Sequence, residues 1–174
     1  MIENIEEYVK GKAELAESLF KAGHTCSQSV VLAFSDYVAE RMEVDVPTAE
    51  KMLMSGFAGF GGGFGRMREV CGCVSGMTAM AGFICPVEKA ADAAGRAAKA
   101  ENYALVQKFA GKFREANGSI ICRELLSGAG AAASSRPEPS ARTEEYYKKR
   151  PCPALAALAA SIVAEEIWNL SGRK

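Results

Sequence analysis

Apolar side chains recur every third or fourth position along most of this chain of 174 residues, and charged side chains fill the positions between them. In the segment 4–22, Glu and Lys side chains lie opposite one apolar stripe, which consists of Ile5, Val9, Ala13, Ala16 and Phe20. This period is typical of an amphipathic helix. No stretch shows a sustained alternation with period two, so the pattern predicts an all-α fold.

Capping residues and prolines divide the pattern into separate helices. Gly23 suits a helix end, and Thr25 suits the N-cap of a second helix that continues to Met42. Pro86 suits the first position of a long alanine-rich helix, and Ser119 suits the cap of a short one. The alanine-rich helix is expected to end at 117. Further helices are expected near 48–55 and from about 71 to the residue before 86. Shorter helices should cover 119–126 and 143–149, and a last helix should run from 152 onward. The expected fold is one domain over residues 1–174, a bundle of about six to eight helices with a Gly-rich loop.

Two regions interrupt the helices. The segment 56–76 is rich in Gly and Phe and ends in the cysteines of Cys-Gly-Cys, and such a glycine content lets the backbone approach other groups closely. Residues 127–141 are low in complexity and predict a mobile surface loop. Three apolar residues of the first loop, Phe57, Phe60 and Phe64, are hard to bury within one small domain, which suggests a homodimer.

Charge and composition restrict the function. The 21 basic and 21 acidic side chains cancel, which argues against a nucleic-acid-binding surface. The acidic N-terminal segment lacks the apolar core of a signal peptide. The uncharged stretch 70–87 is long enough to span a membrane, but its Gly, Cys and Pro content favours a buried core helix. We therefore expect a cytoplasmic protein without membrane insertion, in a compartment where thiols remain reduced and several cysteines indicate metal or redox chemistry.

Four of the six cysteines share one expected position. Cys26, Cys71, Cys122 and Cys152 each fall at or within the first turn of a separate predicted helix. A helix N-terminus carries about half a positive charge, which lowers the pKa of a thiol and favours the thiolate, the form that binds metals and attacks disulfides. The alternative is that a cysteine is a small core residue. That alternative is preferred for Cys85, and both interpretations remain open for Cys73.

These residues also resemble a known family. Gly23-x-x-Cys26, then Cys71-Gly72-Cys73-Val74-Ser75-Gly76, then Gly118-Ser119-Ile120-x-Cys122 and finally Cys152-Pro153 resemble, in order along nearly the whole chain, the C_GCAxxG_C_C family of redox-active proteins. The resemblance implies that Cys26, Cys71, Cys122 and Cys152 are the family cysteines. One position departs from the CGAxxG motif, because Cys73 replaces alanine. A cytochrome with an iron–sulfur cluster is a related protein, which favours a cluster; no CxxCH motif for covalent haem is present.

The chemistry of the cysteines leaves three alternatives. Four thiolates suit a [2Fe–2S] or [4Fe–4S] cluster for electron transfer or redox sensing, with a redox partner that the sequence does not identify. A thiol–disulfide redox protein needs no cofactor, only two cysteines close enough to bond. A structural or regulatory metal-binding module is the third, although zinc sites usually have closely paired cysteines that this chain lacks. An enzyme acting on a small molecule near the loop also stays open.

Other candidate residues give weaker signals. The loop sequence GFGGGFG has the spacing of neither nucleotide-binding motif, GxGxxG or GxxxxGK[ST], and no strand is expected before it. Arg66, Arg68 and Arg123 can offset thiolate charge, although solvated surface arginines are more common. His24, the single histidine, lies two residues before Cys26 and is most simply a turn residue. No serine–histidine–aspartate or paired-carboxylate site can be assembled.

Overall fold

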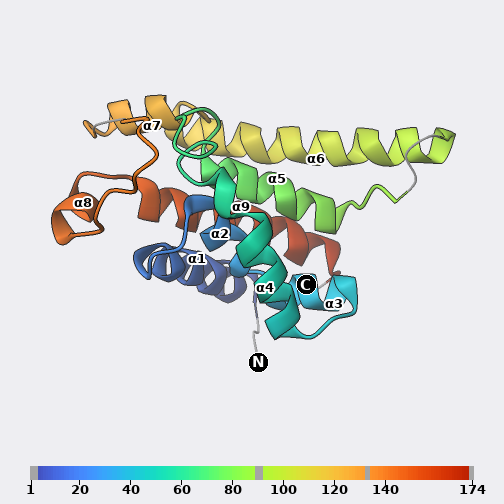
Figure 1. Cartoon of the computed structure of the whole chain (residues 1–174). Coiled ribbons are helices and arrows are strands. Elements are labelled where there is room, and N and C mark those ends of the chain that lie inside the picture. The colour runs from blue at the N-terminus through green and yellow to red at the C-terminus, as the bar shows by residue number, and fades with distance from the viewer. Residues whose placement is uncertain (1–3, 89–91, 132–133, 173–174) are drawn as a thin grey trace.

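A computed structural model describes residues 4–88, 92–131 and 134–172 (Figure 1). Within these ranges the chain forms nine α-helices and one short 3₁₀ turn. Its β-structure there is an isolated antiparallel bridge between Val70 and Ile121. The helices are α1 (Ile5–Lys21), α2 (Cys26–Leu32), α3 (Ser35–Met42), α4 (Val46–Gly56), α5 (Gly72–Ile84), α6 (Ala93–Asn117), α7 (Cys122–Gly128), α8 (Glu144–Lys148) and α9 (Cys152–Leu170). The all-α prediction is confirmed, with one helix more than the upper end of the predicted range.

Side-chain caps define several helix starts. The Asn4 side chain accepts a hydrogen bond from the Glu7 backbone N–H at 2.9 Å and opens α1. Thr25 forms a reciprocal capping box with Gln28 at the start of α2, as expected for this residue type. At the other end of α6, Gly118 has a φ of 78°, a left-handed conformation that glycine adopts without a steric penalty. Local sequence therefore fixes these boundaries.

The prediction of one continuous helix over 26–42 is wrong. The chain turns at Ala33 and Phe34, which separates α2 from α3. The Phe34 side chain is fully buried, and Lys12 lies over its ring at 5.2 Å. Past the turn, α3 packs against α4. Neither Gly nor Pro marks the break, so the hydrophobic pattern continues through a turn that the tertiary packing imposes.

Two helix starts also lie later than predicted. The long helix α6 begins at Ala93, where Asp92 accepts a hydrogen bond from the Gly95 N–H at 2.7 Å, and Pro86 lies in an irregular segment before it. Residues 89–91 of the predicted helix lie outside the described residues. Ser119 does not cap α7; its hydroxyl accepts from the Ile121 N–H at 2.9 Å, and α7 starts at Cys122.

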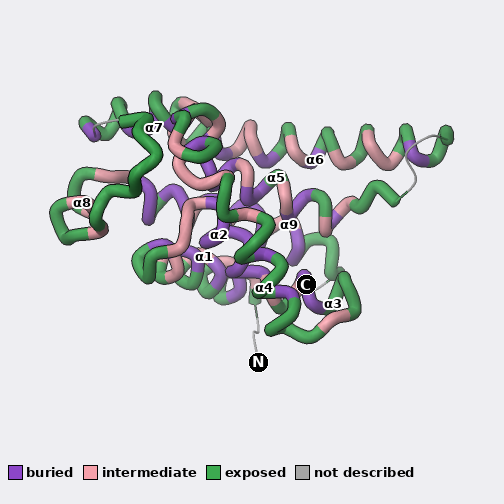
Figure 2. The backbone as a smooth tube through the Cα atoms, viewed as in Figure 1, coloured by how far each residue is buried: buried purple, intermediate pink, exposed green. Residues whose placement is uncertain are grey.

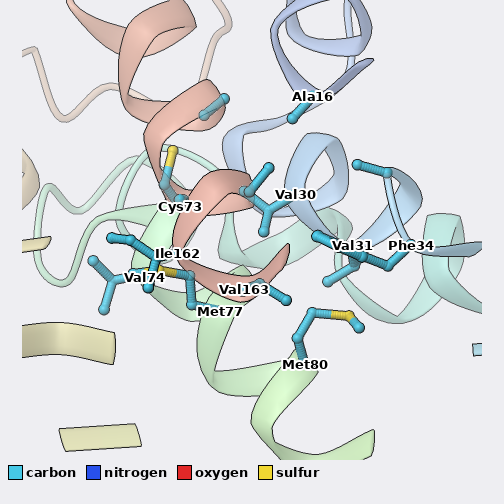
Figure 3. Packing of buried hydrophobic residues seen from close by; sticks show 14 of the residues in the cluster. Ala16, Val30, Val31, Phe34, Cys73, Val74, Met77, Met80, Ile162 and Val163 are labelled. Atoms are coloured by element: carbon cyan, nitrogen blue, oxygen red, sulfur yellow. The ribbon is translucent and has the colours of Figure 1, made fainter. Parts of the chain in front are cut away.

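The helices form layers around one core (Figures 1 and 2). The most extensive pairing is α1 along α9, and α2 packs across α5, while α6 covers α5 from the other side. Fully buried side chains meet in the centre, among them Val30 of α2, Met77 of α5, Val163 of α9 and Phe34 of the turn before α3 (Figure 3). Cys73 belongs to this group and lies at its edge.

The helix α9 is the one described helix that is long and apolar enough to cross a membrane by length and composition. Its apolar residues are largely buried by α1, α2 and α5, as in the core helix of a helical bundle. The predicted spanning-length stretch 70–87 instead contains α5, which is shorter and also buried in its central part.

The loop regions are partly ordered by contacts. Residues 127–128 belong to α7, and residues 134–142 run over the surface without a helix. Residues 132–133 lie outside the described part, and the predicted mobility of 127–141 stays a prediction. In the Gly-rich loop, Phe57 and Phe60 stack at 5.8 Å and are half-buried, and only Phe64 is largely exposed. Stacking within one chain therefore covers part of the surface that suggested a dimer.

Candidate cysteine centre

Five cysteines from separate parts of the chain line one small cavity. Its walls consist of three leucines and the five sulfur-bearing side chains, namely Leu125, Leu126, Leu155, Cys26, Cys71, Cys73, Cys122 and Cys152. The cavity has a volume of about 10 Å³, enough for roughly one water-sized group. All four family cysteines and Cys73 thus meet at one end of the bundle, where α2, α5, α7 and α9 begin.

Helix starts place three of these side chains directly. Cys26, Cys122 and Cys152 are the first residues of α2, α7 and α9. Cys71 is the N-cap of α5. Pro151 is the N-cap of α9, so Cys152 lies in the first turn of this helix, as expected.

The bridge between the Gly-rich loop and α7 fixes two of the cysteines relative to each other. Val70 pairs with Ile121, the Cys71 N–H donates to the Ile120 carbonyl at 2.8 Å, and the Cys122 N–H donates to the Glu69 carbonyl at 2.7 Å. Successive side chains of extended backbone point to opposite faces, so Cys71 and Cys122 fall on the same face of this bridge. That face is turned to the cavity.

Sulfur–sulfur contacts control the ionisation of Cys26. The thiols of Cys152 and Cys73 and the backbone N–H of Gly62 donate hydrogen bonds to its sulfur, and the positive charge of Arg142 lies nearby; together they hold the pKa of Cys26 well below its usual value. Donors to the charged form stabilise that form. These hydrogen bonds therefore favour the thiolate form of Cys26.

The neighbouring thiols are shifted in the opposite direction. Donation to Cys26 raises the pKa of Cys152 and Cys73, and burial adds to both effects. Burial, with the charge of Cys71, raises the pKa of Cys122 to about 11. The pKa of Cys26 is thus lowered, while the pKa values of Cys73, Cys122 and Cys152 are raised.

The two extra cysteines differ from each other. Cys73 is fully buried and its thiol also contacts Cys71, so it belongs to the centre. Cys85 ends α5, does not line the cavity, and has a raised pKa because of burial. His24 does not line it either; its carbonyl accepts a hydrogen bond from Arg142.

One arginine of the Gly-rich loop is buried against the sulfurs. Arg68 is 4% exposed, and its Nη1 lies 4.0 Å from the Cys122 sulfur. Its Nε donates to the Ser134 carbonyl at 2.8 Å, and its Nη2 has no hydrogen-bond partner among the described residues. Arg68 has a φ of 65°, a region that costs a non-glycine residue roughly 1–3 kcal/mol. The loop holds this conformation while it presents a cation to the cysteines.

The other two candidate arginines, Arg66 and Arg123, do not line the small cysteine cavity. Arg123 forms an exposed ion pair with Glu69 at 2.6 Å. Arg66 is half-buried and lines a larger cavity of about 250 Å³ that shares Cys26, Cys122 and Cys152 with the cysteine centre. Sequence reasoning missed Arg142, Tyr146 and Arg150, which line this cavity from the segment before α9. Their only sequence signal is basic and aromatic clustering close to Cys152.

Fold and site together define an all-α protein in which five cysteines line one buried cavity. The model of the family described as "Putative redox-active protein (C_GCAxxG_C_C)" matches residues 24–166, and the chain belongs to this family. Searches of the curated proteins and of the solved structures found no match.

Proposed function

We propose that this redox-active protein binds an iron–sulfur cluster through Cys26, Cys71, Cys122 and Cys152 and serves in electron transfer or redox sensing. The observation that carries the proposal is the convergence of these thiols, from four separate helix starts, on one apolar cavity. A single exchange disulfide needs two cysteines. A cluster uses four thiolates, and when bound it supplies a site that takes up and releases one electron.

The four thiols and the charges around them fit such a group, and its binding would require the sulfurs to move apart, because the cavity between them has a volume of only about 10 Å³. Thiolates and sulfides are negative, and burying negative charge is costly unless a cation or hydrogen-bond donors compensate. Arg68 supplies a buried guanidinium at Cys122, with one nitrogen that lacks a partner in the described chain. The Gly62 N–H supplies a donor to the Cys26 sulfur. These groups would stabilise the charge and tune the reduction potential.

The pairing of the sulfurs supports two irons rather than one zinc. Structural zinc takes four ligands around a single ion. In residues 4–88, 92–131 and 134–172 no group of three or more His, Cys, Asp or Glu side chains is placed to hold one metal ion, whether zinc or iron. A [2Fe–2S] cluster needs two cysteines on each iron. The contact between Cys26 and Cys152, and the bridge that joins Cys71 to Cys122, provide two such pairs.

A second function is favoured by a specific observation. The Cys152 thiol donates a hydrogen bond to the Cys26 sulfur, and the cavity that both thiols line has a volume of only about 10 Å³. Oxidation of these two thiols to a disulfide would release two electrons and two protons, which reduce a disulfide of a redox partner to two thiols. The low pKa of Cys26 makes it the attacking thiolate in this alternative.

Anaerobic purification and reconstitution with iron and sulfide distinguish the candidates. For the cluster we expect a brown protein with iron and sulfide in equal amounts and with bleaching on reduction. A colourless, metal-free protein that loses two free thiols on mild oxidation would support the disulfide function and contradict the cluster. Zinc with four protected thiols would contradict both.

Cys71 and Cys73 allow a test of which sulfur completes the centre. Cys71→Ser should lose the reconstituted cluster, because the bridge holds this residue beside Cys122. Cys73→Ser should keep most of the iron, since the family motif has alanine there and the serine replaces a buried thiol without removing a family cysteine. Iron and sulfide per chain are the measurements, with visible circular dichroism to compare the cluster environments. Loss of iron in Cys73→Ser with retention in Cys71→Ser would reverse the assignment.

Self-association is a further proposal. Phe64 and Met67 are exposed on the Gly-rich loop, at 37% and 62%. Exposed apolar patches on a protein surface mark contact surfaces. Light scattering at micromolar concentration should give the mass of a dimer, and Phe64→Ser should shift the mass toward that of the monomer. A monomer mass for the unmodified protein would refute the proposal.

A further inference from the structure

The 250 Å³ cavity beside the cysteine centre carries an unusual set of charges. Four of its lining residues are arginines, Arg66, Arg68, Arg142 and Arg150, and none of its described lining residues is acidic. Cys26, Cys122 and Cys152 form its inner wall, while exposed residues of the segment 134–142 form its rim. The cavity therefore connects the surface to the sulfurs through a positively charged passage.

Among the described residues, backbone carbonyls rather than acids accept hydrogen bonds from Arg66, Arg68 and Arg142. Arg142 donates to the carbonyls of Phe20 and His24 and stacks on the Phe20 ring, with its guanidinium carbon 4.3 Å from the ring centroid. Arg66 donates to the carbonyl of Arg136 at 2.6 Å. In the part of the chain that the structure describes, no carboxylate bonds to Arg66, Arg68 or Arg142.

The positive charges of the arginines at this cavity repel one another. Burial and the nearby charges of Arg68 and Arg150 lower the pKa of Arg66, and Tyr146 and Glu138 offset this only in part. Arg150 lies over the Tyr146 ring at 4.8 Å, so it too is held at the cavity. Keeping like charges together costs free energy that a bound anion would recover.

We propose that this cavity, defined by Arg66, Arg68, Arg142 and Arg150, binds a small molecule bearing a carboxylate or phosphate group and brings it to the thiols of the cysteine centre. Guanidinium groups match the paired oxygens of these anions. Ligand pockets for larger molecules have volumes of about 300–1,000 Å³. A cavity of about 250 Å³ suits a single phosphate or a short dicarboxylate rather than a nucleotide. The proposal does not require that a cluster is bound.

Alkylation of the reduced, metal-free protein by two reagents that differ in charge tests the proposal directly. Iodoacetate is anionic and iodoacetamide is neutral, and peptide mass spectrometry reads both reactions at each cysteine. At Cys26 the rate ratio of iodoacetate to iodoacetamide should be roughly tenfold or more above that at Cys85, because a positive cavity concentrates anions. Cys85 is the internal control, since Glu101 and Glu166 lie near it. Equal ratios at the two cysteines would overturn the proposal.

Variants locate the effect. Arg66→Gln and Arg142→Gln should each lower the ratio at Cys26, whereas Arg66→Lys should retain most of it and Arg114→Gln, an exposed change on α6, should leave it unchanged. Far-ultraviolet circular dichroism and thermal unfolding check that each variant is folded. An unchanged ratio in folded Arg66→Gln and Arg142→Gln would overturn the assignment to this cavity.

Direct binding provides a readout without thiol chemistry. Calorimetric titration with inorganic phosphate and with malonate, at constant ionic strength maintained by chloride, should show saturable binding that Arg66→Gln weakens about tenfold or more. Either anion should also slow alkylation of Cys26 by iodoacetamide and leave Cys85 unaffected. The absence of binding to both the metal-free and the reconstituted protein would mean that the arginines serve only the charge of the cysteine centre. Because the metal-free protein is used, failure here is separate from failure of the cluster proposal.

Discussion

Replacing Cys26 by serine is expected to abolish the iron–sulfur centre, leaving less than about a tenth of the iron per chain, since one thiolate of four is lost. Cys26 contacts Cys152 and Cys73 and receives the Gly62 N–H, so it connects the two sides of the centre. A serine hydroxyl keeps the shape of the side chain but is a poor ligand at neutral pH. Iron and sulfide analysis after anaerobic reconstitution, with the visible spectrum, measures the loss.

Cys85→Ser is the matched control, because it removes a thiol that lies outside the cavity. Its iron content and spectrum should equal those of the unmodified protein. If Cys26→Ser holds a full cluster, or if Cys85→Ser loses it, the centre has been placed on the wrong residues. The same pair of variants also tests the disulfide alternative, in which only Cys26→Ser stops the loss of two thiols on oxidation.

Gly76→Ala is expected to destabilise the protein by about 1–3 kcal/mol, as overpacking does in a tightly filled core. A Cβ atom at Gly76 would lie 2.8 Å from the Val30 Cβ and 3.1 Å from the Ser27 carbonyl oxygen, where α5 crosses α2. Neither partner is the free end of a flexible side chain, so the two helices must separate. Chemical denaturation followed by circular dichroism gives the free energy of unfolding.

Gly82→Ala on the same helix should have the opposite sign. A Cβ at Gly82 meets nothing within 4 Å, and the residue is exposed. Alanine there should stabilise α5 by roughly 0.5–1 kcal/mol, because glycine loses more conformational entropy in a helix. Equal effects of the two substitutions would show that helix propensity, rather than the close approach of α5 to α2, governs position 76. A change in the separation of α2 and α5 should also affect the cysteine centre, because α2 begins with Cys26 and α5 follows Cys71.

The clash at Gly72 explains why the cysteine motif contains this glycine. A Cβ at Gly72 would lie 2.8 Å from the Phe60 carbonyl oxygen and 2.9 Å from the Cys26 Cβ. A Cβ at Gly63, which has a φ of 70°, would similarly lie 2.8 Å from the Cys122 Cβ. The glycines of this region let the loop backbone contact the cysteines directly, which is how N–H groups such as that of Gly62 reach sulfur.

The sequence by itself determined the fold class and the position of the cysteines along it. Amphipathic periodicity, the Thr25 cap and the Gly118 stop are local features, so the all-α fold followed from short windows of residues. The same local signals placed Cys26, Cys71, Cys122 and Cys152 at or next to helix starts. The family match rests on these positions and their order.

Only the tertiary structure decided which groups surround those cysteines. The turn at Phe34 follows from burying one ring in the core, and no local signal in the sequence marks it. Cys73 joins the centre because α5 starts against Cys26, which no spacing along the chain reveals. Arg66 and Arg142 are 76 positions apart and meet at one cavity because the segment before α9 folds back over the Gly-rich loop. Such contacts depend on the packing of distant segments, whereas helix starts depend on neighbours within about four residues.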